Sequence, residues 1–122
     1  MGDRHVIGFR KNQESPTIYL YSHWGGEDRF KTAVEALEAA RPRWSQDDYA
    51  TRIAISTIVG NQWSEETGFG ISVDEFCMPD WDEVIVIEWE TKTVFVYRGD
   101  QHETLKFDVS LSFDFFTMNY GS

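Results

Sequence analysis

Apolar residues recur along this chain at two spacings, one typical of strands and one typical of helices. Residues 5–11 and 17–24 are apolar runs on either side of a turn-like segment at 12–16, which predicts a hairpin. Residues 84–89 and 93–98 repeat this arrangement across residues 90–92. Both pairs predict neighbouring strands of an antiparallel sheet.

Two segments between these hairpins have the three- and four-residue apolar spacing of helices. The first covers residues 28–41, and Pro42 ends it. The second opens at Ser45, which with Asp48 resembles a capping box that has Asp in place of the usual Glu, and runs to Gly60. Each helix has an apolar stripe that must pack against another layer.

The remaining segments complete the predicted fold. Residues 68–72 are expected to form a short strand or a close-packed turn. Residues 105–111 alternate between apolar and polar, as a strand with one buried face does. From Ser112 onward the chain either continues that strand or forms a short terminal helix, which we prefer. The pattern predicts one α+β domain over residues 1–122, with a mostly antiparallel sheet of about five strands and two main helices on one face.

The composition is that of one folded domain. The 122 residues are 41% hydrophobic and 16% aromatic, enough to bury a core at this length. No apolar run approaches the roughly 20 residues that span a bilayer, and no apolar segment follows Met1 as a signal peptide requires. Cys77 is the single cysteine, which excludes an intrachain disulfide. We expect a soluble, cytoplasmic protein with no membrane contact.

The net charge of −10 is unevenly distributed. Residues 1–60 contain eight Lys/Arg and eight Asp/Glu, whereas residues 61–122 contain three Lys/Arg and thirteen Asp/Glu. We expect one acidic face that includes Asp74, Glu75, Asp80, Asp82, Glu83, Glu88 and Glu90. Such a face repels duplex nucleic acid and attracts a basic protein surface. The same charge also keeps an aromatic-rich domain in solution.

The chemically richest stretch ends the second predicted strand. It combines aromatic, hydroxyl and imidazole groups with two glycines: Tyr19, Tyr21, Ser22, His23, Trp24, Gly25 and Gly26. These side chains have polar groups on apolar bodies, and the glycines permit a sharp turn or the close approach of a ligand. The stretch is either a ligand site or a structural turn in which Trp24 covers the core and His23 bonds a backbone carbonyl.

Three further residues extend the candidate ligand site. Gly68 and Gly70 permit a ligand to approach the backbone closely. Arg52 lies near the start of the second helix, which the pattern predicts to be buried, so its charge needs a partner. That partner is either an acid such as Glu66 or the phosphate or carboxylate of a ligand.

Catalytic and metal-binding signals are weak in this sequence. Ser22 and His23 are neighbours on a strand and face opposite sides, which prevents a nucleophile and base pair. No catalytic motif surrounds Cys77, and no His or Cys spacing is typical of a metal site. Gly68 and Gly70 lack the third glycine and the lysine of phosphate-binding loops. We therefore expect no catalytic residue, no metal and no cofactor.

Four segments carry a family resemblance: residues 19–26, 43–53 and 66–72, and the strand at 93–94 that leads to residues 112–115. In this order they resemble a family of small uncharacterised proteins of tailed phages and prophages, particularly in actinobacterial hosts. The resemblance covers almost the whole chain. It implies a phage accessory protein in the cytoplasm of a bacterial host, and it implies no activity.

Two functions from different classes follow as hypotheses. In the first, the protein is a non-catalytic ligand-binding module that sequesters a host nucleotide signal as a counter-defence. Tyr19, Tyr21 or Trp24 would stack a base, and His23 and Arg52 would bind polar or phosphate groups. In the second, the acidic half binds and inhibits a basic or nucleic-acid-binding host protein. The residue chemistry favours the first hypothesis, and the charge favours the second.

Overall fold

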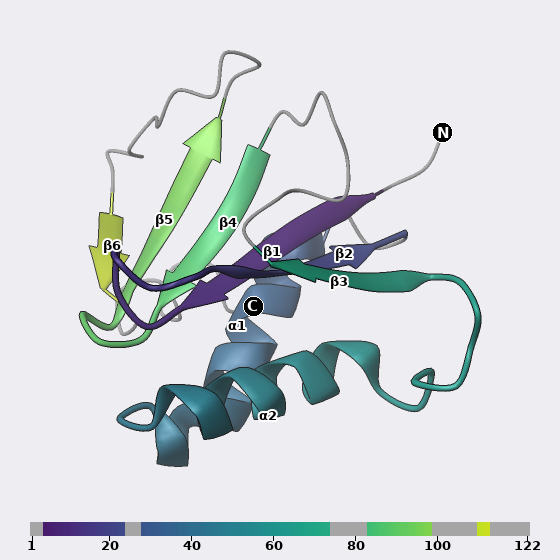
Figure 1. The fold of residues 1–122 in the computed structure, drawn as a ribbon, viewed down its shortest axis with the longest axis horizontal. Coiled ribbons are helices and arrows are strands. Elements are labelled where there is room, and N and C mark those ends of the chain that lie inside the picture. Colours follow the sequence, from purple (N-terminus) through teal and green to yellow (C-terminus); the bar gives the residue numbers. More distant parts are fainter. Residues whose placement is uncertain (1–3, 24–27, 74–82, 99–109, 113–122) are drawn as a thin grey trace.

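The computed structural model describes residues 4–23, 28–73, 83–98 and 110–112. In chain order the elements are β1 (His5–Arg10), β2 (Ile18–Ser22), α1 (Arg29–Ala40), the 3₁₀ helix η2 (Arg41–Arg43), α2 (Asp47–Val59), β3 (Phe69–Val73), β4 (Glu83–Glu88), β5 (Thr93–Arg98) and β6 (Ser110–Ser112). Figure 1 shows α1 and α2 on the same side of the sheet. The two predicted hairpins, the two helices and the short strand near residues 68–72 are therefore confirmed.

The strands form one mixed sheet of six strands in the order β3-β2-β1-β4-β5-β6. β1 and β4 run parallel, and the other neighbouring strands are antiparallel. β6 has three residues, whereas each of the other strands has five or six. The predicted class, α+β with a mostly antiparallel sheet and two helices on one face, is confirmed.

Two predictions near the C-terminus fall largely outside the described residues. The alternating segment at 105–111 overlaps them at residues 110 and 111, which belong to β6. β6 pairs with β5, and Ser112 is opposite Thr93. Ser112 is thus the last residue of a strand, and the terminal helix predicted after it lies outside the described part of the chain.

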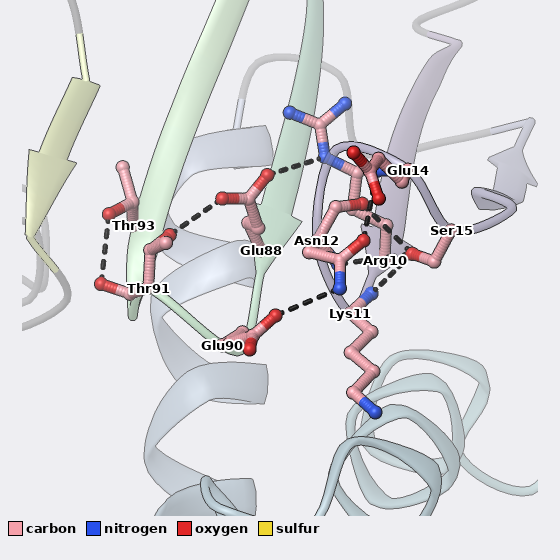
Figure 2. A network of polar contacts seen from close by, with 9 residues as sticks. All are labelled: Arg10, Lys11, Asn12, Glu14, Ser15, Glu88, Glu90, Thr91 and Thr93. Atoms are coloured by element: carbon pink, nitrogen blue, oxygen red, sulfur yellow. Dashed lines mark hydrogen bonds and ion pairs between the residues drawn. The ribbon is translucent and has the colours of Figure 1, made fainter.

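Side-chain hydrogen bonds form the turn between β1 and β2 (Figure 2). The Ser15 hydroxyl accepts from the backbone N–H groups of Lys11 and Asn12 at 3.0 Å and donates to the Asn12 carbonyl at 2.9 Å. The Asn12 side chain accepts from the Glu14 N–H at 2.9 Å and donates to Glu90 at 2.8 Å. The Asn12 and Ser15 side chains thus bond backbone groups that the strand ladder leaves unpaired, which is typical of a turn. Residues 12–15 form the predicted turn.

The start of α2 differs from the prediction. η2 follows α1 directly, and the backbone N–H of Gln46 donates to the Arg43 carbonyl at 2.8 Å, which continues the turn past Ser45. Gln46 is consequently the N-cap, with φ −128° and ψ 93° and no side-chain capping bond. The predicted capping box of Ser45 and Asp48 is therefore wrong. The predicted end is confirmed, because Gly60 follows α2 with a φ of 65°, which favours glycine.

The main core lies between the helices and one face of the sheet. At its centre are Ile7 and Phe9 of β1 and Ile85 and Ile87 of β4, each at most 1% exposed. The helices contribute Ala33, Val34, Ala36, Leu37, Ala40, Ala50, Ala54, Ile55 and Val59 to the same cluster. Complete burial of a large apolar side chain contributes about 1.5–3 kcal/mol, so this layer supplies much of the driving force for folding.

Two tryptophans hold the helices in place, Trp89 by a bond from the end of β4 to α2 and Trp44 by a bond from the end of η2 to α1. Trp89 stacks on Phe9 with ring centroids 6.2 Å apart and donates its indole N–H to the Thr51 hydroxyl of α2 at 2.8 Å. Trp44 donates its indole N–H to the Leu37 carbonyl at 2.9 Å. Each buried indole thus contributes apolar contact area while its N–H keeps a hydrogen bond.

The opposite face of the sheet is also buried at its centre. Val6, Val84, Val86 and Phe95 form a second apolar cluster there. Glu88 lies on the same face as Val84 and Val86, because alternate residues of β4 point to the same side of the sheet. Its side chain is only 2% exposed. A carboxylate in such surroundings requires a cation and hydrogen bonds.

Arg10 and Thr91 supply these partners to Glu88 (Figure 2). Arg10 donates from Nε at 2.9 Å, and the Thr91 hydroxyl donates at 2.7 Å. Arg10 also places its guanidinium carbon 5.1 Å from the ring centroid of Phe95. The prediction that Glu88 contributes to an exposed acidic face is wrong, because the chain buries it beside Arg10.

The other predicted members of the acidic face are only partly described. Glu90 is exposed and accepts the hydrogen bond from Asn12. Residues 74, 75, 80 and 82 and the side chain of Glu83 lie outside the described part of the structure. The acidic face therefore stays a prediction from the charge distribution.

Replacing Glu88 with alanine should lower the free energy of unfolding by about 3–5 kcal/mol, because Arg10 keeps its charge and loses the buried carboxylate. Urea denaturation followed by circular dichroism measures this loss. Glu90→Ala is the matched control, and removing that exposed carboxylate should cost about 1 kcal/mol or less. Equal losses for the two variants would contradict a buried, structural role for Glu88.

Candidate functional site

Tyr21 and His23 lie next to each other at the end of β2. The Tyr21 hydroxyl and His23 Nδ1 form a hydrogen bond of 3.0 Å, and the ring centroids are 6.3 Å apart. His23 is exposed, whereas Ser22 is 2% exposed and its hydroxyl has no hydrogen-bond partner among the described residues. Ser22 lies on the helix side of the sheet, opposite His5 in the ladder. The strand therefore separates Ser22 from His23, as its alternation predicts.

Gly68 and Gly70 lie across from this strand end. His23 donates its backbone N–H to the Gly68 carbonyl at 2.8 Å, and Gly68 has a φ of 108° that a residue with a side chain rarely adopts. Gly70 pairs with Tyr21, and a Cβ added at Gly70 would lie 3.9 Å from the Tyr21 ring. Gly68 thus permits a positive φ at this position. The space beside Gly70, which has no side chain, is bordered by the ring of Tyr21.

Tyr19 packs over the neighbouring strand. It is opposite Gly8 of β1, and a Cβ added at Gly8 would lie 2.9 Å from Cε1 of Tyr19. Tyr19 and Tyr21 also pack against the second apolar cluster. The Tyr19 ring therefore covers the sheet where Gly8 has no side chain, on the face away from the helices.

Three of the predicted site residues, Trp24, Gly25 and Gly26, lie outside the described residues. In the described part of this stretch, Tyr21 and His23 form a hydrogen-bonded pair, and the His23 ring is exposed.

Arg52 is not brought together with His23. It lies on α2, is exposed and lines a cleft on the helix side of the sheet, whereas Tyr21 packs on the opposite side. No ion pair found among the described residues involves Arg52, and Glu66 is exposed as well. The premise that this charge is buried is wrong, because the Arg52 side chain is exposed and water can solvate it, so neither an internal acid nor a ligand is required as a partner.

The cleft beside Arg52 has a volume of about 420 Å³ and lies between α2 and β3; we call it the α2–β3 cleft. Its lining residues are Ile18, Asp47, Asp48, Thr51, Arg52, Ile55, Trp63 and Ile71. A second hollow of about 170 Å³ shares Trp63 and Ile71 with it and reaches Glu65 and Phe69. Figure 1 shows β3 above α2, with the sheet ending at β3.

Large apolar side chains are exposed at this cleft and on the strand that borders it. Trp63 is 55% exposed, Ile71 52% and Val73 57%, although residues of the core are at most 9% exposed. Scattered single apolar residues are ordinary on a protein surface, but Trp63 and Ile71 share the lining of one concave site. Such an arrangement is typical of a site that another molecule covers.

The charges at the cleft are mostly negative. The residues that line the cleft and the smaller hollow beside it include three acids and one cation, which are Asp47, Asp48, Glu65 and Arg52. Asp47 and Asp48 stand in the first turn of α2, where carboxylates favour the positive end of the helix dipole. The cleft thus combines apolar side chains with the carboxylates of Asp47 and Asp48 and the guanidinium of Arg52.

Sequence reasoning did not identify Trp63 and Ile71 as site residues. Phe69, Ile71 and Val73 alternate with small residues, which indicates a strand with one apolar face. That pattern cannot show whether another element covers the face. The position of β3 at the end of the sheet leaves Ile71 and Val73 exposed.

Among the described residues, no group of three or more His, Cys, Asp or Glu side chains is placed to hold a metal ion. None of the described helices is long and apolar enough to cross a membrane. Comparison with protein-family models, with curated proteins and with solved structures gave no match. The proposed function therefore rests on the geometry of the α2–β3 cleft.

His23→Ala should lower the free energy of unfolding by less than about 1 kcal/mol, because the His23 side chain is exposed. Leu20→Ala on the same strand is the control and should cost about 2–5 kcal/mol, because Leu20 is 1% exposed in the main core. Chemical denaturation of both variants measures the two losses. A loss at His23 as large as that at Leu20 would show that His23 is a structural residue.

Proposed function

We propose that the protein is a non-catalytic binding module whose binding site is the α2–β3 cleft. The observation that carries this proposal is the exposure of Trp63 and Ile71, each more than half accessible, at an apolar cleft of about 420 Å³. Exposing such side chains to water is unfavourable by about 25 cal/mol for each Å² of apolar surface, so a ligand that covers them gains binding free energy.

The chemistry of the cleft fits an apolar, planar group with a polar substituent. Ile18, Ile55 and Ile71 line its apolar part, and the indole of Trp63 offers a face on which a ring can stack. Arg52 is close enough to line the same cleft and can donate hydrogen bonds to an anionic group. An aromatic platform beside an arginine is the arrangement expected of the ligand module, with Trp63 in the role that the sequence assigned to Tyr19, Tyr21 or Trp24.

The resemblance to phage accessory proteins indicates that the bound molecule comes from the bacterial host. A basic host protein in the bacterial cytoplasm fits the acidic lining of the cleft. Its sequestration would act as a counter-defence. A nucleotide signal fits Trp63 and Arg52 but meets the carboxylates of Asp47 and Asp48, which repel phosphate. The lining therefore favours the protein partner.

The neutral dye Nile red tests the cleft, because it is an apolar, planar ring system without a charge that Asp47 and Asp48 would repel. We expect the wild-type protein to bind it with increased fluorescence and Trp63→Ala to weaken binding about tenfold or more, since a ring loses its stacking surface. Fluorescence titration measures both dissociation constants.

Tyr49→Ala is the matched control for this titration. Tyr49 is an aromatic residue of α2 that is 49% exposed and does not line the cleft. Its replacement should change dye binding by less than about twofold, within the usual effect of a surface substitution. A wild-type protein that binds no dye, or equal losses in the two variants, would contradict the α2–β3 cleft as the binding site.

A further inference from the structure

β3 is an edge strand within the described part of the structure. The sheet order ends at β3, which pairs with β2 alone. Its sequence, Phe-Gly-Ile-Ser-Val, contains no charged residue and no proline. Natural edge strands usually carry such residues because they prevent pairing with another chain. β3 lacks that protection.

One hydrogen bond determines which backbone groups of β3 face the open edge. His23 donates its N–H to the Gly68 carbonyl at 2.8 Å. In an antiparallel ladder alternate residues bond to the same neighbour, so residues 68, 70 and 72 direct their backbone groups to β2. Ile71 and Val73 therefore direct their N–H and C=O groups away from β2, toward the open edge.

The same two residues also expose their side chains. Ile71 is 52% exposed and Val73 57%, and Ile71 lines the α2–β3 cleft. A strand placed beside β3 would find backbone partners at Ile71 and Val73. Every second side chain of that strand would point to the helix side of the sheet, where the cleft lies.

We propose that β3 accepts an extended, basic segment of a protein partner as an additional strand, with the apolar side chains of that segment in the α2–β3 cleft. This inference rests on the proposed function, because it uses the same cleft. Main-chain hydrogen bonds to an edge supply affinity in such strand addition, and pockets for alternate side chains supply specificity.

Charge complementarity identifies the occupant as basic. The residues that line the cleft and the hollow beside it include three carboxylates, Asp47, Asp48 and Glu65, against Arg52. The exposed Glu66, which precedes β3, adds a further acid. Lysine or arginine side chains of an incoming strand would be attracted to these groups even from the face away from the cleft, because charges interact over about 8–10 Å at physiological salt.

A second copy of this chain fits the edge less well. Pairing of β3 with its own copy would bring a strand without Lys or Arg to this edge, together with a second acidic cleft. The whole chain has a net charge of −10, so association of two copies also meets long-range repulsion.

A short capped peptide of alternating valine and lysine is the probe, tested on the full-length protein. Calorimetry measures its affinity, and amide hydrogen exchange by NMR locates its contact. At a peptide concentration about ten times the dissociation constant, exchange at Ile71 and Val73 should slow about tenfold. The amides of Gly70 and Ser72, which already face β2, should change little.

Two control peptides separate backbone pairing from charge. The valine–lysine peptide with an N-methyl group on every residue has no backbone donor on either edge, and it should bind about tenfold more weakly or worse. A peptide of alternating valine and glutamate should bind at least about tenfold more weakly, with the difference shrinking as salt is added. Equal binding of the glutamate peptide would overturn the basic occupant.

Val73→Pro tests the edge from the side of the protein. It removes one outward N–H at a position where an edge strand tolerates proline, and it should weaken peptide binding about fivefold or more. Val73 does not line the α2–β3 cleft, so dye binding should persist in this variant. If the variant does not fold, the N-methylated peptide gives the same information on wild-type protein.

The remaining outcomes are distinct. Dye binding without peptide protection of Ile71 and Val73 would overturn strand addition and leave the proposed function standing. Binding of neither probe would overturn both. Concentration-dependent dimerisation in analytical ultracentrifugation, with these two amides protected before any peptide is added, would overturn the basic peptide in favour of a second copy.

Discussion

The fold depends on burying one face of the parallel pair β1 and β4 beneath α1 and α2. Ile7, Phe9, Ile85 and Ile87 lie opposite one another in that pair and are at most 1% exposed. Parallel neighbours require a long crossover, and the chain places both helices between the two hairpins. The helices therefore cover the centre of the sheet. α2 contacts β1 and is fixed by the hydrogen bond from Trp89 to Thr51.

Burial on the second face adds a different constraint. Glu88 is held there by Arg10 and Thr91 beside apolar side chains, as Figure 2 shows for the polar partners. Such a pair costs desolvation energy and contributes little net stability compared with apolar packing, but it tolerates no exchange of either partner alone. It thus favours one register between β1 and β4, where Arg10 and Glu88 are opposite each other.

The coverage of the sheet by the helices explains where the α2–β3 cleft lies. α2 covers the central strands, and the sheet continues past it to β3, so side chains of β3 on the helix side are only partly covered. The cleft and the open strand edge are therefore consequences of one arrangement. The pair of Tyr21 and His23 lies on the other side of β2, so the sheet divides residues that the sequence grouped into one site.

Local sequence determined the elements of this protein, because their signals act over a few residues. Alternating apolar residues gave the hairpins, three- and four-residue spacing gave α1 and α2, and glycine with a positive φ ended α2 at Gly60. The separation of Ser22 from His23 followed from the same alternation. Strand order, the burial of Glu88 and the exposure of Arg52, Trp63 and Ile71 were decided only by the tertiary structure. Each of these depends on which distant element lies across a residue, and a period along the chain carries no information about that partner.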